Sequence, residues 1–284
     1  MHKEEVRFQQ GVLEQFRLPK GVGELTSDAL LKKAGEQMKA LGLGSIVEGG
    51  HPELREVSIT RDYLEKKVKV PVYSVEDLDK YLDGFSDADK LHTSTSRESV
   101  KIGERAVIKS SHLNKGADEV IAECGKTMDQ YTQGLPVVPQ AAVIHDQKSN
   151  LFYVVEPRGI PFTERVKDAA RGYNENGDMT PLDDCLRAVG RLVKRCKESE
   201  TYWSGTFGKD EEALILFDSE KGSDAIITDD KSFYSRPMLG WVESVIRYAS
   251  KTVTPQEEKQ KALLERFKKI IEDESGVELK TRGR

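Results

Sequence analysis

The sequence has few cysteines and no long apolar run. Its 284 residues include three cysteines, at positions 124, 185 and 196, and no two of them form a Cys-x-x-Cys pair. A disulfide scaffold and a cysteine-rich zinc site are therefore excluded, and a reducing cytoplasm is the expected setting. No apolar run approaches the roughly 20 residues of a membrane span, so we expect no membrane partner. The start, MHKEEVRFQQ, has no apolar stretch of the signal-peptide type, which argues against secretion.

The charge is almost balanced. The chain has 44 Lys and Arg against 49 Asp and Glu, a formal net charge of -5, and 37% of its residues are hydrophobic. It is polar for a globular protein but too hydrophobic for wholesale disorder. The mild acidity argues against nucleic acid as a partner, because phosphate binding requires a clustered basic face. The five histidines lack metal-ligand spacing, and no Gly-x-Ser-x-Gly element indicates an α/β-hydrolase.

The first part of the chain, residues 1–90, is predicted to be a helical extension. Ser27 can cap a helix whose apolar stripe ends at the glycines of 42–44, and Ser74 is predicted to open a second, short helix. The polar run that follows places a boundary near residues 86–91. This extension is a candidate surface for a protein partner.

Residues 91–158 are predicted to form a small sheet with one helix. Amphipathic spacing predicts a helix over residues 117–133, closed by Gly134. The connector Glu156-Pro157-Arg158-Gly159 ends the segment; its proline restricts the backbone, and its glycine allows conformations that other residues rarely adopt. Four strands are expected, over residues 99–102, 105–109, 140–144 and 151–155.

Residues 159–284 are predicted to be mainly helical. Thr180-Pro181-Leu182-Asp183 has the pattern of a capping box at the start of a long helix. A hairpin then leads into Asp229, and two helices finish the chain. The hairpin strands are expected over 213–217 and 224–228, and the helices over 237–251 and 256–273. The order of elements predicts an α+β fold.

Two short segments of the chain each end an apolar strand in a charged residue. The first is Ala106-Val107-Ile108-Lys109, and the second is Ile226-Ile227-Thr228-Asp229, followed by Lys231-Ser232-Phe233. They resemble two segments of the protein kinases, and in particular of the early serine/threonine kinases of the T-seven group of podophages: the strand that ends in the phosphate-pairing lysine and the segment of the metal-binding aspartate. Glu156 follows Lys109 by 156 − 109 = 47 residues and Asp229 follows it by 229 − 109 = 120, near the spacing of a kinase domain with few insertions. The resemblance implies a two-lobe domain that binds ATP and Mg²⁺.

The resemblance also implies roles for particular residues. Lys109 would contact the phosphates, and a helix carboxylate would hold it, for which Glu123 is preferred to Glu119. Glu156 would lie at the hinge beside the nucleotide, and Asp229 would bind Mg²⁺. The phosphate-covering loop is His92-Thr93-Ser94-Thr95-Ser96-Arg97, in which the hydroxyls of Ser94 and Ser96 stand where kinases have glycines.

The catalytic loop departs from the kinase pattern. Kinases have an aspartate base and, five residues later, an asparagine that binds the second metal ion. Counted from the strand, these positions are Gly208 and Ala213; counted from Asp229, they are Asp210 and Ile215. Asp210 is the candidate base, but the asparagine is missing in both registers. Because loss of a metal ligand lowers the rate strongly, we expect a weak kinase or a pseudokinase.

Three functions remain open. The first is a divergent serine/threonine kinase or pseudokinase that modifies or binds a protein, in a bacterial host cytoplasm if the phage resemblance holds. The second is a non-catalytic inhibitor or adaptor with no nucleotide site. The third is a small-molecule phosphotransferase or an AMP-transferring relative of the kinases.

Overall fold

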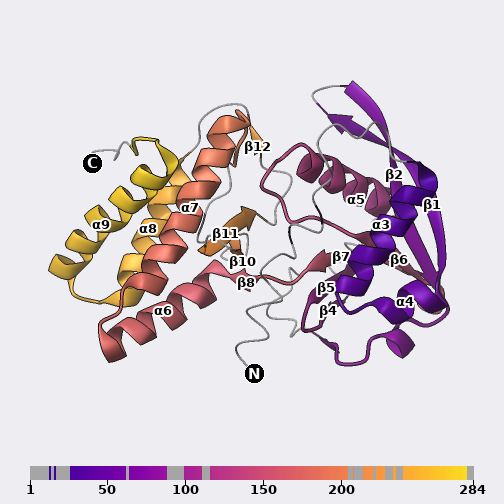
Figure 1. The fold of residues 1–284 in the computed structure, drawn as a ribbon, viewed down its shortest axis with the longest axis horizontal. Helices are drawn as coiled ribbons and strands as arrows, with labels where there is room; N and C mark the ends of the chain where they lie inside the picture. Colours follow the sequence, from indigo (N-terminus) through magenta and orange to yellow (C-terminus); the bar gives the residue numbers. More distant parts are fainter. Residues whose placement is uncertain are drawn as a thin grey trace. The chain divides into compact units, whose positions relative to one another are not determined.

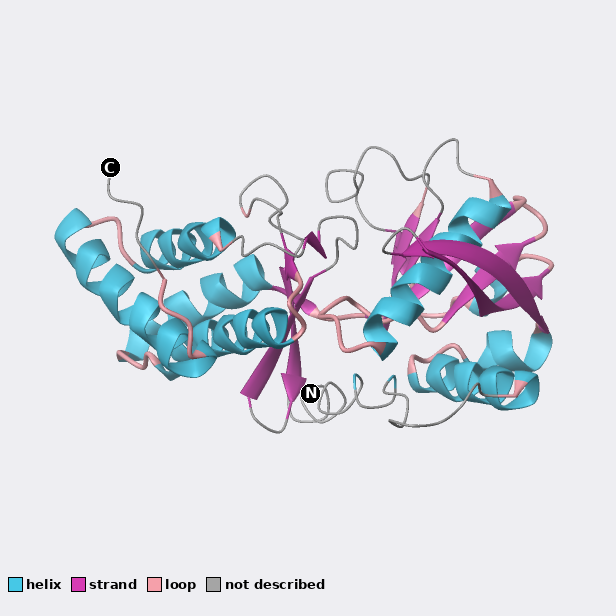
Figure 2. Ribbon diagram, turned by 90° about the horizontal axis from the view of Figure 1, so that it is seen from above, coloured by secondary structure: helices cyan, strands magenta, loops and turns pink. Residues whose placement is uncertain are grey.

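The computed structural model has an α+β fold. It describes Leu13, Phe16 and residues 26–61, 64–87, 99–110, 116–203, 207, 214–219, 222–227, 233–234 and 239–279. The chain divides into two compact units, each described by itself. The sheet unit comprises Val12–Gln133 and Val138–Arg158, and the helical unit comprises Met1–Gly11, Gly134–Val137 and Gly159–Arg284. Figure 1 labels their elements, and Figure 2 shows that helices dominate one unit whereas the other carries the large sheet.

A seven-stranded sheet forms the centre of the sheet unit, in the order β1-β2-β6-β7-β5-β4-β3. β2 and β6 pair in parallel, and the other neighbours are antiparallel. The four strands expected between residues 99 and 155 are confirmed as β4, β5, β6 and β7. The strands are β1 (His51–Arg61), β2 (Leu64–Val75), β3 (Ser86–Asp87), β4 (Val100–Ile102), β5 (Ala106–Ser110), β6 (Ala142–Asp146) and β7 (Leu151–Pro157).

Helix α5 (Ala117–Thr132) covers one face of this sheet, at the position predicted for it. Its buried Val120, Ile121 and Cys124 form one apolar cluster with side chains of the sheet strands. Gly125 permits the close approach, since a Cβ atom there would lie 2.6 Å from Cγ2 of Val68. The sheet residues of the cluster are Val70, Val72, Val143 and Val154.

The described part of residues 1–90 is not a helical extension, and this prediction is corrected. The expected first helix is present as α3 (Ser27–Ala40), capped by Thr26, and α4 (Gly44–Gly49) follows it. Residues 51–75, however, form the hairpin β1–β2 at one edge of the sheet. Ser74 lies inside β2 and opens no helix; a single 3₁₀ turn, η1 (Leu78–Tyr81), comes after it. The expected boundary near 86–91 falls within the sheet unit.

The helical unit contains four helices among its described residues. The predicted long helix is α7 (Thr180–Glu198), and the last two are α8 (Gly240–Val253) and α9 (Glu257–Ser275). α6 (Phe162–Asn176) precedes them. The expected capping box is not formed, because the cap position of α7 is Met179; Asp178 instead accepts a hydrogen bond from the Thr180 amide at 2.9 Å.

Short strands complete the helical unit. The predicted hairpin is confirmed as β10 (Leu214–Ser219) and β11 (Gly222–Ile227), and β8 (Ile160–Pro161) pairs with β10. β9 (Tyr202–Trp203) pairs with β12 (Phe233–Tyr234). The buried face of α7 packs in one large core with both tryptophans, Trp203 and Trp241, whose rings lie 5.2 Å apart.

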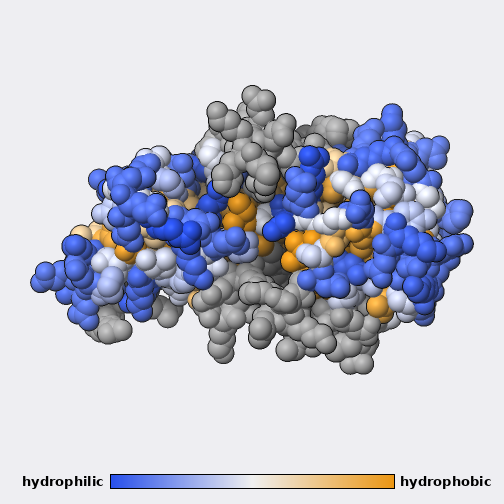
Figure 3. Space-filling view, turned by 90° about the horizontal axis from the view of Figure 1, so that it is seen from below, coloured by the Kyte–Doolittle hydropathy of each residue, from blue (hydrophilic) through white to orange (hydrophobic). Residues whose placement is uncertain are grey.

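The described surface is mostly hydrophilic. Figure 3 shows charged and polar residues over most of the described part of one face, with smaller apolar groups between them. Within the described residues, no helix has both the length and the apolar character needed to cross a membrane.

Candidate functional site

The pairing of β5 with β7 places Lys109 and Glu156 on one face of the sheet. Val107 stands opposite Glu156, and Lys109 stands opposite Val154. Because side chains two residues apart share a face, Lys109 and Glu156 are diagonal neighbours across the two strands. Val154 on the same face packs in the cluster under α5, so the Lys109 side chain lies on the helix-covered face.

Lys109 and Glu156 form a largely buried ion pair. Nζ of Lys109 lies 2.5 Å from Oε2 of Glu156, and the two side chains are 24% and 10% exposed. The second carboxylate oxygen, Oε1, accepts a hydrogen bond of 3.0 Å from Nε2 of the buried Gln140. Both oxygens of the carboxylate are therefore bonded, which is the condition for keeping such a charge away from water.

Helix α5 adds a thiol and a second carboxylate close to this pair. Cys124 is fully buried, and burial raises the pKa of its thiol, with the negative charges of Glu156 and Glu123 raising it further. Both carboxylates thus lie within electrostatic reach of one thiol. The thiol stays protonated, so Cys124 is a core residue of the site and not a nucleophile. All three cysteines are buried core residues.

The structure gives Lys109 a different described partner from the one predicted. Glu123 was expected to hold Lys109, and Glu156 was expected at a hinge. The described hydrogen bond and ion pair of Lys109 instead go to Glu156, whose side chain points into the sheet unit. The physical reason is the ladder register, which brings Glu156 beside Lys109 although the two are distant along the chain.

Four predicted residues lie outside the described part of the chain: Ser94, Ser96, Asp210 and Asp229. β11 ends at Ile227, two residues before Asp229, and the amide of Ile227 donates a 2.8 Å hydrogen bond to the carbonyl of Pro136. Asp210 belongs to the segment between β9 and β10.

Gln140 belongs to this cluster but was not predicted from the sequence. It was included in a predicted strand, but it precedes β6 and is 8% exposed. A glutamine between Pro139 and the apolar run Ala141-Ala142-Val143 is a weak signal, because a polar residue at a strand start is usually solvated. Only the structure brings its amide to Glu156.

Metal binding has limited support in this part of the molecule. Among the described residues, no group of three or more His, Cys, Asp or Glu side chains could hold a metal ion. Glu123 and Glu156 could offer oxygen ligands of the kind that Mg²⁺ prefers, but a complete site would need further groups.

A second polar cluster ties the hairpin to the helices of the helical unit. Nη2 of Arg165 on α6 lies 2.7 Å from Oδ1 of Asp218, which also accepts a 3.3 Å hydrogen bond from Ser223. Arg191 on α7 donates to the carbonyl of Ser223 and pairs with Glu274 on α9. These contacts join α6, α7 and α9 to β10 and β11, so their role is structural.

Comparison of the sequence with known protein families and with curated proteins found no match.

Proposed function

We propose that this chain is a nucleotide-binding protein with a kinase-like fold, in which Lys109 contacts the phosphates of ATP, and that it works by binding or modifying a protein. The observation that carries the proposal is the ion pair of Lys109 with Glu156, itself held by Gln140. Replacing a buried ion pair by apolar side chains is often neutral or stabilising. A paired lysine under a helix therefore has a better rationale as a binding group than as a stabilising one.

The order of elements supports the proposal. The strands β4 and β5 come directly before α5, with Lys109 next to the last residue of β5; β6 and β7 follow α5, and a hairpin in the helical unit leads toward Asp229. This is the layout that the kinase resemblance implies.

The chemistry assigned to the site is positioning and charge neutralisation. Phosphoryl transfer needs positive charge and Mg²⁺ around the phosphates and little covalent help. Lys109 would bridge the phosphate oxygens and Glu156, which fixes the direction of its side chain. Asp229 would provide the main metal ligand and Asp210 the base. Because the asparagine of the catalytic loop is missing, we propose slow transfer or none, with a pseudokinase favoured over an active kinase.

One observation favours the alternative of an inhibitor or adaptor without a nucleotide site. The Lys109 ammonium is already neutralised by Glu156, and both Glu156 oxygens are satisfied without any ligand. In that case the pair would only specify the packing of α5 on the sheet, and ATP would not bind.

The test is ATP·Mg²⁺ binding by calorimetry and thermal unfolding on the parent, Lys109→Ala, Asp229→Ala and a matched control, Lys101→Ala. Lys101 on β4 is also a partly buried, paired lysine, with Asp79 at 2.8 Å, but it stands opposite Ile108 and so on the other face from Lys109. A ligand at a hundredfold excess over its Kd stabilises the native state by about 2.7 kcal/mol. We expect this stabilisation in the parent and Lys101→Ala, and its loss in the other two.

Equal binding by the parent and a folded Lys109→Ala protein would refute the role of Lys109. No binding by the parent would refute the nucleotide site and favour the adaptor. If ATP binds, transfer of labelled γ-phosphate or α-phosphate to protein or small acceptors separates a kinase, an AMP-transferring enzyme and a pseudokinase.

A further inference from the structure

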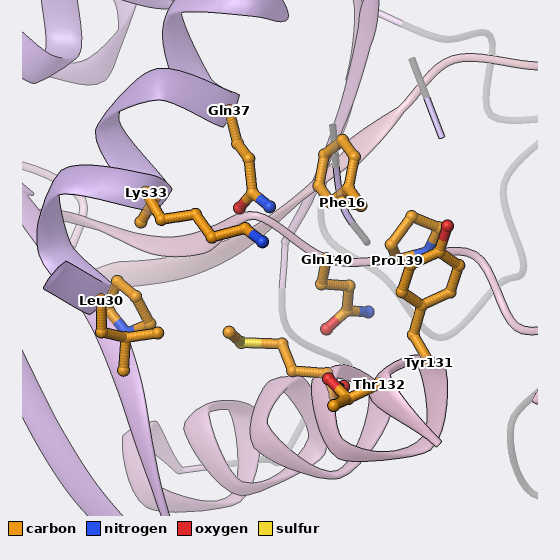
Figure 4. Close-up of a pocket in the computed structure, with 11 residues that line it drawn as sticks. Phe16, Leu30, Lys33, Gln37, Tyr131, Thr132, Pro139 and Gln140 are labelled. Carbon is orange, nitrogen blue, oxygen red and sulfur yellow. The ribbon is translucent and has the colours of Figure 1, made fainter. Parts of the chain in front are cut away.

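A small pocket lies in the sheet unit, and one of its lining residues is Gln140, the residue that also donates to Glu156. α3, the end of α5, Pro71 of β2 and the segment Pro139–Gln140 surround it, and its volume is about 40 Å³. This corresponds to roughly three water positions, at about 10–15 Å³ each. Figure 4 shows Lys33 and Gln37 reaching in from α3 and Gln140 lying among the lining side chains.

Gln140, one of the lining residues, has an unsatisfied buried acceptor. Its Nε2 donates to Glu156, but its Oε1 is buried and has no hydrogen-bond donor within the described residues. The amide cannot turn over, because its oxygen would then face the Glu156 carboxylate. A buried acceptor that lacks a donor carries a free-energy cost, which a bound donor would remove.

The other lining groups restrict what that donor belongs to. Leu30, Pro71 and Met128 provide apolar walls, and Lys33 places an ammonium group on the α3 side. Burial lowers the pKa of Lys33, an effect that the nearby Glu36 partly opposes. The electrostatic potential on the Gln140 side is negative, since Oε1 is an acceptor and the amide nitrogen is bonded to the Glu156 carboxylate. A carboxylate would be repelled there, whereas a neutral group with an N–H donor at one end and an acceptor at the other fits both sides.

We propose that this pocket binds a small neutral molecule of the primary carboxamide type, which donates an N–H to Oε1 of Gln140, presents its oxygen toward Lys33 and places a short apolar group against Leu30 and Met128. Because the other end of the Gln140 amide holds Glu156, the ligand fixes Gln140 and with it the Lys109–Glu156 pair. This second part rests on the proposed nucleotide function; the binding itself does not.

The experiment uses the full chain with ¹³C-methyl methionine and propionamide as the probe. Met128 lines the pocket, and its methyl signal is assigned with Met128→Leu. Methyl acetate, which has no N–H, and propionate, which is charged, are the comparison probes. The variants are Gln140→Met, which removes the acceptor, and Thr132→Leu, which fills the rim from an exposed position of α5 and leaves Gln140 intact. Gln147→Met, at an exposed turn of the same unit, is the matched control.

We expect propionamide to shift the Met128 signal saturably, with a Kd in roughly the millimolar range for so small a ligand. Compared with propionamide binding to the parent, methyl acetate and propionate should bind the parent at least about tenfold more weakly. Propionamide should bind Gln140→Met and Thr132→Leu more weakly by a similar factor. Gln147→Met should bind propionamide as the parent does. No saturable shift would mean that water alone satisfies Gln140, and equal binding of all three probes would mean non-specific apolar contact; either result overturns the site.

The coupling is tested by measuring the Kd of ATP·Mg²⁺ with and without saturating propionamide. We expect an increase of about fivefold in ATP affinity, lost in Gln140→Met. An unchanged Kd overturns the coupling while leaving the carboxamide site in place. If ATP does not bind at all, the proposed nucleotide function fails, and the Met128 titration still decides the pocket.

Discussion

Replacing Lys109 by methionine tests whether the Lys109–Glu156 pair is as buried and as coupled as the structure describes. Methionine keeps the apolar stem but removes the ammonium, so the Glu156 carboxylate, 10% exposed, keeps only Gln140 as a described partner. Removing one member of a buried pair costs about 3–5 kcal/mol. Since Lys109 is 24% exposed and Gln140 still donates to Glu156, we expect the lower end, about 3 kcal/mol in the free energy of unfolding.

A double-mutant cycle separates the pair from its surroundings. Glu156→Gln removes the charge but keeps the shape, and the partly exposed Lys109 can reach solvent, so we expect a smaller loss of about 1 kcal/mol. In Lys109→Met/Glu156→Gln no unpaired buried charge is left. We expect the double variant to recover most of the loss of Lys109→Met and to end about 1 kcal/mol below the parent, which corresponds to a coupling energy of about 3 kcal/mol.

The assay is thiol labelling in low urea at pH 8, resolved by peptide. Cys124 reports on the sheet unit, whereas Cys185 and Cys196 report on the helical unit, and all three are buried. Tryptophan fluorescence cannot replace it, because both tryptophans, Trp203 and Trp241, belong to the helical unit. A loss of about 3 kcal/mol accelerates labelling through opening by roughly a hundredfold. The reasoning is refuted if Cys124 is labelled less than about threefold faster in Lys109→Met than in the parent. It is also refuted if the labelling rates of Cys185 and Cys196 increase as much as that of Cys124.

Two further predictions concern the helical unit, and tryptophan fluorescence during urea unfolding measures both. Burial raises the pKa of Cys185 to about 12 and that of Cys196 to about 11. The protonated thiols therefore contribute fully to the free energy of unfolding below pH 9.0, the pKa of a thiol in the unfolded chain, and this contribution is lost as the pH rises above that value. In that range each thiol lowers the free energy of unfolding by about 1.4 kcal/mol per pH unit. Cys196→Ala should therefore reduce the slope of the free energy of unfolding against pH by this amount. An unchanged slope between pH 9 and pH 10.5 would contradict burial of the Cys196 thiol as the cause. Gly190→Ala should destabilise by about 1–3 kcal/mol, because its Cβ would lie 2.6 Å from Cβ of Glu274 where α7 meets α9. The matched control Gly172→Ala on α6, with no atom within 4 Å, should gain about 0.5–1 kcal/mol, and equal effects of the two alanines would show that α7 and α9 are not in close contact.

Periodicity predicted the elements with one strongly apolar face. α5, α7 and α9, and strands β5 and β7, lie within a few residues of their expected positions. The hairpin β1–β2 was missed because its exposed face is densely charged, with Lys67 and Lys69 alternating with half-buried Val68 and buried Val70. That alternation has the period of a strand, but the charges resemble those of a solvated connection. α6 escaped notice because its buried stripe consists largely of small residues such as Ala169 and Ala170.

The sequence identified both members of the ion pair but not their pairing. Lys109 was predicted because it ends an apolar strand in a context similar to that of a kinase. Glu156 was predicted at a hinge, and Glu123, nearer the middle of the following helix than Glu119, was predicted as the partner of Lys109. The choice of Glu156 depends on the β5–β7 register, in which a shift by one residue would turn its side chain to the other face. Gln140 depends in turn on where the chain enters β6.

The asymmetry of the pair bears on what it does. Lys109 and Glu156 both lie on strands of the sheet, and a pair kept only to support the packing of α5 would be expected to have both charged groups equally enclosed. Instead Glu156 is 10% exposed and bonded at both oxygens, whereas Lys109 is 24% exposed and bonded to one of them. The carboxylate is thus the fixed member, anchored by Gln140, and the lysine is the member whose side chain is more exposed. A lysine has three N–H donors, so the contact with Glu156 fixes the direction of the side chain and leaves donors that an anion could use. This arrangement is better suited to presenting a positive charge to a phosphate than to fastening a helix, which the apolar cluster under α5 already does.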